Sequence, residues 1–141
     1  MRTMHHRLRD ALEVTRDELR AAGPAPPPLQ ELLLYCQGFC AALDGHHRSE
    51  DRTLFRGIEA AHPELAPVLR RLEQDHSMIA HLLQGLTAAM ERGDPPEELD
   101  RHLEGVAAIM ESHFRYEERE LLPALESLHL DASIADALGP L

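Results

Sequence analysis

The chain has 141 residues, enough for one domain with its own hydrophobic core, and a formal net charge of −11. This charge argues against a nucleic-acid surface, which needs a basic face, and against docking on anionic lipid. No apolar run approaches the ~20 residues that span a bilayer, and the first ten residues contain no apolar signal sequence, so we expect a cytoplasmic protein. Aromatic residues make up only 4% of the chain, and the abundant Leu, Ala, Glu and Arg favour helices.

Proline and glycine divide the chain into helical blocks. The predicted helices cover about residues 3–22, 29–61, 64–92, 97–128 and, as a short tail helix, 131–138. Apolar residues recur every three or four positions in the long blocks, as one face of a helix requires. Four long helices joined by short connections predict an all-α, up-down-up-down four-helix bundle that forms a single domain over 1–141. Pro67 must lie in the first turn of the third helix or kink it.

Histidine and glutamate interrupt the apolar faces of all four helices. A histidine and a glutamate four residues apart project from the same helix face, and each would cost several kcal/mol if buried without a partner. Coordination of a metal ion satisfies all of these groups at once. The predicted metal ligands are His5, His46, Glu50, His76, His113 and Glu117.

The two His-x-x-x-Glu pairs belong to an internal repeat. Residues 46–55 and 113–122 are identical at five of ten aligned positions. Each half of the chain therefore offers one histidine from its first helix and a His-x-x-x-Glu pair from its second. This is a ligand set for two equivalent metal ions that the carboxylates can bridge. Imidazole with carboxylate suits iron or manganese, and six ligands are too many for one tetrahedral zinc.

Several neighbouring residues leave alternatives open. We prefer His5 to His6 in the first helix because leucines follow His5 at i+3 and i+7, although helix ends are uncertain by a residue or two. His81 is interpreted as a surface residue, and whether it contributes to the site stays open. For His47 and Asp51, orientation of a ligand and simple exposure to solvent are equally good interpretations.

Two other classes of function compete with this one. A ferritin-like iron oxidase or store needs Glu-x-x-His on each of two helices. Glu59 with His62 and Glu73 with His76 have that spacing, but the first pair falls at a helix end, just before Pro63. A metal-dependent regulatory module, which acts through a protein partner without turnover, is the other alternative.

The order His, His-x-x-x-Glu, His, His-x-x-x-Glu resembles the hemerythrin-like (HHE cation-binding) domains over about residues 5–128. Residues 75–83 and 113–123 are similar to the family's third-helix and fourth-helix signatures. The resemblance implies a non-haem centre of two iron ions joined by an oxo or hydroxo bridge, in which zinc or manganese can substitute. It implies binding of dioxygen, peroxide or nitric oxide for sensing or redox protection, with or without turnover.

The chain departs from the oxygen-carrying members of that family at two positions. Those members have a second histidine on the third helix, four residues after the first, where this chain has Ala80. They also have an aspartate five residues after the fourth-helix histidine, where this chain has Glu117 at four and Glu118 at five. These differences favour sensing or redox chemistry over oxygen transport.

Overall fold

The protein is all-helical in a computed structural model that describes residues 1–21 and 29–127. Its four long helices lie close to the predicted ranges and are α1 (Arg2–Ala21), α2 (Leu29–Ser49), α4 (Ala66–Arg92) and α5 (Pro96–Ser127). The short helix α3 (Phe55–Ala61) lies between α2 and α4 in the chain. The tail helix predicted at 131–138 falls outside the described residues. Among the helices that the structure describes, none is long and apolar enough to cross a membrane.

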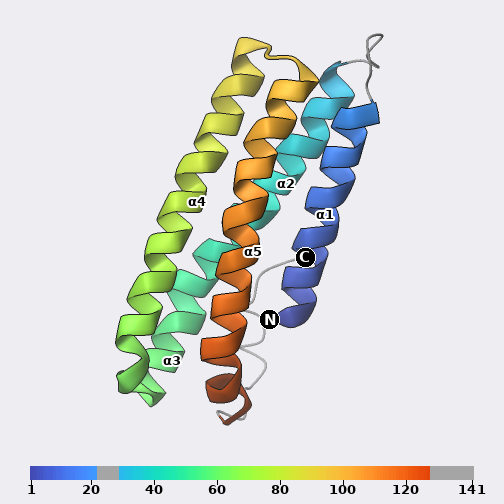
Figure 1. Ribbon diagram of the computed structural model, residues 1–141. Coiled ribbons are helices and arrows are strands. Elements are labelled where there is room, and N and C mark those ends of the chain that lie inside the picture. The colour runs from blue at the N-terminus through green and yellow to red at the C-terminus, as the bar shows by residue number, and fades with distance from the viewer. Residues whose placement is uncertain (22–28, 128–141) are drawn as a thin grey trace.

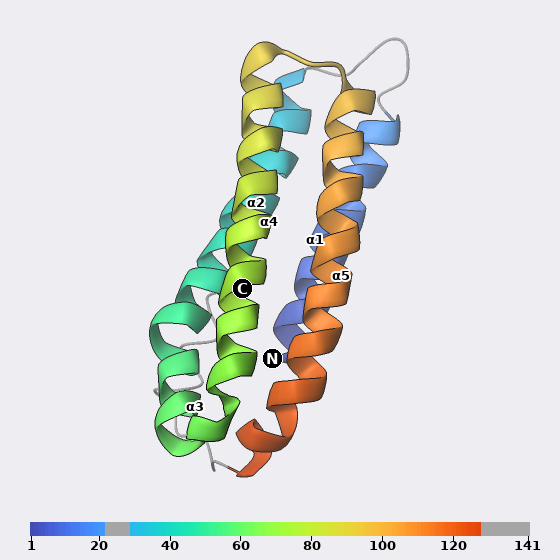
Figure 2. The same cartoon turned by 60° about the vertical axis from the view of Figure 1, so that its left-hand side comes forward.

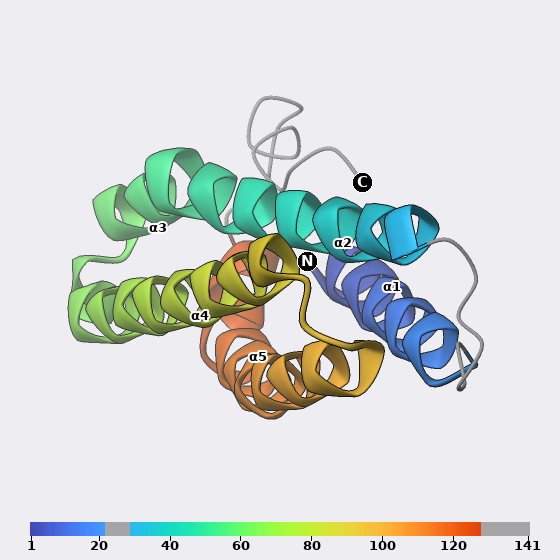
Figure 3. The ribbon, with the colours of Figure 1, turned by 90° about the horizontal axis from the view of Figure 1, so that it is seen from above.

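The four long helices lie side by side as a bundle (Figures 1 and 3). α1 packs against α2 and α5, and α4 packs against α5 and α2. The connection between α3 and α4 and the connection between α4 and α5 lie at opposite ends of the bundle (Figure 1). Figure 2 shows that α5 bends near its C-terminal end, where Pro123 removes one backbone donor from the helical ladder.

The second predicted helix, 29–61, is not one continuous α-helix. A π turn (Glu50–Leu54) separates α2 from α3, and in it the N–H of Phe55 donates to the carbonyl of Glu50, five residues back rather than four. The wider turn changes the register of the residues that follow, so that Leu54 and Phe55 are both buried. Single π turns inside helices are often found at functional sites. Here the turn begins at a predicted metal ligand.

The ends of α4 follow from its sequence. Pro67 lies in the first turn of α4, where its missing N–H costs no hydrogen bond, so it does not kink the helix. Gly93 ends the helix with φ of 75°, in the left-handed region that glycine adopts without strain. The N–H of Gly93 donates to Met90 and that of Asp94 to Ala89, which satisfies the last carbonyls of the helix.

Two apolar clusters fill the bundle on either side of a polar layer. The larger cluster includes Leu86, Leu99 and Leu103, near the turn between α4 and α5. The smaller cluster consists of Leu54, Phe55, Ile58, Leu69, Leu72, Leu121 and Leu125, at the α3 end. Buried polar residues between them include His5, Glu50 and Glu117. The fold therefore encloses ionisable groups in an apolar interior. 

Candidate metal centre

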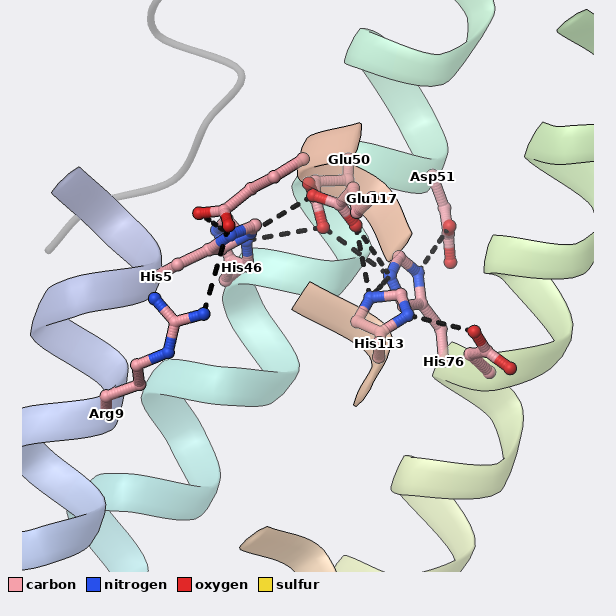
Figure 4. A network of polar contacts seen from close by, with 10 residues as sticks. His5, Arg9, His46, Glu50, Asp51, His76, His113 and Glu117 are labelled. Atoms are coloured by element: carbon pink, nitrogen blue, oxygen red, sulfur yellow. Dashed lines mark hydrogen bonds and ion pairs between the residues drawn. The ribbon is translucent and has the colours of Figure 1, made fainter. Parts of the chain in front are cut away.

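Seven ionisable side chains meet inside the bundle and are withdrawn from water. Each of them is 5% exposed or less. They come from α1, α2, the π turn, α4 and α5, and Figure 4 shows most of them pointing toward one another. The seven are the six predicted ligands His5, His46, Glu50, His76, His113 and Glu117, together with His47. The structure thus brings together every residue that the sequence predicts as a ligand.

The seven residues form two groups that share Glu50. One group consists of His47, Glu50, His76 and His113, and the other of His5, His46, Glu50 and Glu117. Within each group one nitrogen or oxygen of every residue lies within 4.8 Å of the others. Each group is therefore compact enough to hold one metal ion. We call them the three-histidine group and the two-histidine group.

Both glutamates reach from one group to the other. Glu117 directs Oε1 to His5 Nε2 at 3.1 Å and Oε2 to His113 Nε2 at 3.1 Å. Oε1 of Glu50 lies 3.3 Å from His46 Nε2 and 3.5 Å from His76 Nε2. Carboxylates placed in this way can bridge two metal ions, because each presents oxygen to histidines of both groups.

Carboxylates outside the cluster fix the orientation of three of the histidine rings (Figure 4). The Nδ1 atoms of His76, His113 and His5 lie 2.8 Å from Asp51, 3.1 Å from Asp75 and 3.2 Å from Glu118. A carboxylate only accepts hydrogen bonds, so Nδ1 carries the hydrogen in each ring. On a neutral ring Nε2 then keeps its lone pair, and this is the atom that points into the cluster. A second hydrogen-bond partner of this kind accompanies most metal-binding histidines.

The spacing of the inward atoms fits a cation. His76 Nε2 and His113 Nε2 are 3.0 Å apart, a distance that requires either a hydrogen between the two nitrogens or a cation beside them. Neighbouring ligands of an octahedral cation with bonds of about 2.1 Å have this separation. Within the part of the chain that the structure describes, both oxygens of Glu50, Oε2 of Glu117 and Nε2 of His47 have no hydrogen-bond partner. Metal ions would satisfy all of these atoms.

The electrostatics of the cluster also favour metal binding. Burial lowers the pKa of His47 well below its ordinary value, as do the nearby His76 and His113, so this ring stays neutral. Burial and the neighbouring Glu117 raise the pKa of Glu50 well above the usual range for glutamate. Burial alone would also raise the pKa of Glu117, but its contacts with Glu50, His113 and His5 hold it well below the usual range. These opposite directions favour a proton on Glu50 when no metal is bound, and a cation would compete with that proton.

His47 is the site residue that sequence analysis missed. Its ring is 4% exposed and stacks on the ring of His76 with centroids 3.9 Å apart. A signal was present in the sequence, because Glu50 lies four residues after His46 and three after His47, and both spacings share a helix face. His47 adds to the three-histidine group the nitrogen that Ala80 cannot supply.

Of the other residues that the sequence left open, His6 and His81 are exposed, whereas Asp51 lies at the edge of the cluster. The ring of His6 is 74% exposed and faces Asp10, whereas His5 is buried. His81 is exposed. Asp51 contacts a cluster histidine and is not simply solvated.

The residues of the ferritin-like alternative are not brought together. Glu59 pairs with Arg70 at 2.6 Å, and His62 Nδ1 donates a hydrogen bond to Glu64 at 3.0 Å, both at the α3 end of the bundle. His76 instead belongs to the three-histidine group. A second Glu-x-x-His pair therefore does not reach the cluster.

Comparison with known proteins gives one match. The family model described as the hemerythrin HHE cation binding domain matches residues 1–125. Searches of curated proteins and of solved structures returned no match. The matched range includes all seven residues of the cluster.

Proposed function

The chain belongs to the hemerythrin HHE cation-binding domain family, and we propose that its cluster binds two iron ions that take up or react with a small oxidant: dioxygen, peroxide or nitric oxide. The up-down-up-down order of the helices and a cytoplasmic location, both expected from the sequence, are part of this proposal. Sensing and redox protection are the roles that such a site would serve. Manganese or zinc could occupy the same ligands.

The observation that carries the proposal is the unequal pair of groups. Three histidines face one position, two face the other, and both glutamates present oxygen to both. Iron bound there would supply one-electron and oxygen chemistry. The two-histidine group offers one nitrogen fewer, so we assign the place of the external ligand to the side of His5 and His46.

Apolar residues of the chain lie beside this position for the external ligand and limit the access of water to it. The ring of Phe114 stacks on His5 with centroids 3.9 Å apart and an interplanar angle of 3°. Leu8 and Leu43, in the same apolar cluster as Phe114, are fully buried. An apolar wall favours a small neutral ligand and excludes water, which strengthens every charge interaction inside the site.

His47 changes one expectation drawn from the sequence. Ala80 favoured sensing or redox chemistry over oxygen transport, because a third-helix histidine was missing. In the proposal His47 supplies that nitrogen from α2, so the argument from Ala80 no longer separates reversible binding from reaction. The measurement below decides between them.

The first experiment is anaerobic loading with iron(II), followed by metal analysis and absorption spectra in air, with and without azide or peroxide. We expect two iron ions per chain, near-ultraviolet bands of a bridged pair and a new charge-transfer band with azide. Consumption of added peroxide would indicate turnover, and a stable oxygen adduct that is lost under vacuum would indicate reversible binding. One zinc ion or no metal after iron loading would contradict the proposal.

The role of His47 has its own matched test. His47→Ala should lower iron content to about half and abolish the near-ultraviolet bands of a bridged pair, because the three-histidine group loses a ligand. His81→Ala, which replaces an exposed histidine on α4, is the control and should leave both unchanged. Full iron content and unaltered bands of the bridged pair in His47→Ala would show that His47 is not a ligand.

A further inference from the structure

We propose that carboxylates outside the cluster make the two metal positions electronically unequal, so that the higher oxidation state is favoured in the three-histidine group. The negative charges of Asp51 and Asp75 lie beside histidines of that group. In the two-histidine group the corresponding carboxylate is Glu118, and the positive charge of Arg9 offsets part of its negative charge. All four are positioning residues that act through the histidines. The inference rests on the proposed binding of two iron ions.

Asp51 and Asp75 are 36% and 28% exposed, and each directs its carboxylate at one ring of the three-histidine group. Asp51 accepts from His76 Nδ1 at 2.8 Å and Asp75 from His113 Nδ1 at 3.1 Å. Among the described residues, no arginine or N-terminal amine lies within the 4.0 Å of an ion pair from either aspartate. A ring that donates to an unneutralised carboxylate is a more basic ligand. More basic ligands stabilise the more highly charged metal ion.

The two-histidine group has a different environment. Glu118 accepts from His5 Nδ1 at 3.2 Å, but its other oxygen lies 3.9 Å from the guanidinium of Arg9. The same guanidinium lies 5.4 Å from the centre of the Phe114 ring that stacks on His5. This positive charge lies on the His5 side of the cluster and offsets part of the charge of Glu118; the guanidinium also donates two hydrogen bonds to Glu111. Arg9 and Glu118 are 29% and 18% exposed, so solvent screens their charges in part, whereas the ring of His5 that they act on is buried.

The positions of the helices relative to one another determine which histidines these charged side chains contact. Asp75 precedes His76 in the chain but contacts His113 on α5, and Asp51 follows Glu50 but contacts His76 on α4. Each aspartate thus reaches across to a neighbouring helix, and both reach the three-histidine group. Arg9 lies one turn after His5 on α1 and is held there by Glu111 at 2.8 Å. The unequal environment is therefore built from three separate helix contacts.

The test is a potentiometric titration of the iron-loaded full chain, with the mixed-valent state followed by electron paramagnetic resonance and the two iron ions resolved by Mössbauer spectroscopy. Asp75→Asn keeps the shape and a hydrogen-bond acceptor but removes the charge. A loss of about 10- to 100-fold in relative stabilisation of the oxidised ion, typical for such partners, equals about 60 to 120 mV. Asp75→Asn should raise the potential of the three-histidine iron by this amount, and Asp75→Glu should restore it.

Arg9→Gln should lower the potential of the other iron, because Glu118 is no longer offset. Both changes narrow the range of potential over which the mixed-valent state is populated. Asp44→Asn is the control, since Asp44 pairs with Arg48 and contacts no cluster histidine. Equal shifts in Asp44→Asn and Asp75→Asn, or a shift confined to the two-histidine iron, would overturn the inference while leaving two-iron binding intact. A wild-type chain without two iron ions would overturn the proposed function itself.

Discussion

The two halves of this bundle are equally buried but are completed in different ways. Near the turn between α4 and α5, Leu86, Leu99 and Leu103 are fully buried among other apolar side chains. Around the polar layer, Glu50 and Glu117 are just as inaccessible, yet several of their oxygens have no hydrogen-bond partner among the described residues. One half is complete with the chain alone, and the other contains buried polar atoms that a bound cation would satisfy.

In the metal-free chain the buried side chains of the two halves make contributions of opposite sign to the free energy of folding. Burying a leucine side chain contributes about 1.5 to 3 kcal/mol to folding. Burying a polar group without a partner costs about 1 to 3 kcal/mol. We therefore expect the apolar half to hold the metal-free bundle together against the polar layer.

The largest expected effect is that of metal itself. Iron(II) at about a thousand times its dissociation constant should raise the free energy of unfolding by about 4 kcal/mol, because the unfolded chain lacks the assembled ligands. Anaerobic urea denaturation with and without iron measures this. The same urea midpoint with and without iron would contradict the expectation that metal stabilises the polar layer.

A cavity in the apolar half should act independently of metal. Leu86→Ala should lower the free energy of unfolding by about 2 to 5 kcal/mol, through lost burial and an unfilled space. Leu86 lies ten residues after His76 on α4, about 15 Å along the helix, so the loss should be the same in metal-free and iron-loaded protein. A loss that differs between the two states would show that the halves are coupled.

The smallest expected effect concerns the ion pair that joins α1 to α5 in the apolar half. Arg16 Nε lies 2.8 Å from Asp100, both side chains are 18% exposed, and we expect Arg16→Gln to cost about 0.5 to 1 kcal/mol. Burial alone would raise the pKa of Asp100, but its hydrogen bond from Arg16 lowers that pKa below the ordinary 3.8. The contribution is therefore present above about pH 4 and is lost as pH falls through the lowered pKa.

Chemical denaturation between pH 7 and pH 3 tests this. Arg16→Gln should be less stable than wild type at pH 7 and approach it at the acidic end. Arg101→Gln, whose partner Glu98 is 42% exposed, is the control with little expected effect at either pH. A difference from wild type that is constant over the whole range would assign the effect of Arg16 to packing instead.

Much of the site followed from the sequence because its residues lie on regular helices. His46, His113 and their glutamates interrupt stripes that are otherwise apolar, and the repeat relates the two pairs. Helix periodicity also placed His5 inside and His6 outside, as the structure has them. These inferences needed only the local geometry of an α-helix.

Two features did not follow because they depend on departures from that geometry or on contacts between helices. His47 enters the cluster just before the π turn, and helical spacing put both His46 and His47 within reach of Glu50 without showing that both rings face inward. Asp75 adjoins His76 in the chain but contacts His113, which depends on how far α4 and α5 are shifted along each other. Periodicity within one helix does not specify such a shift.

The π turn makes this segment tolerant of a change in chain length. It holds one residue more than an α-helical turn over the same rise. Removal of one residue, such as Arg52, would restore a regular α-helix in which Leu54, Phe55 and α3 keep nearly the same orientation relative to His46 and His47, because the turn gives up its extra residue. The same deletion within the regular part of α2 would instead rotate all later residues by about 100° relative to the earlier ones. The π turn is therefore a place where the chain can lose a residue without separating the histidines from the smaller apolar cluster.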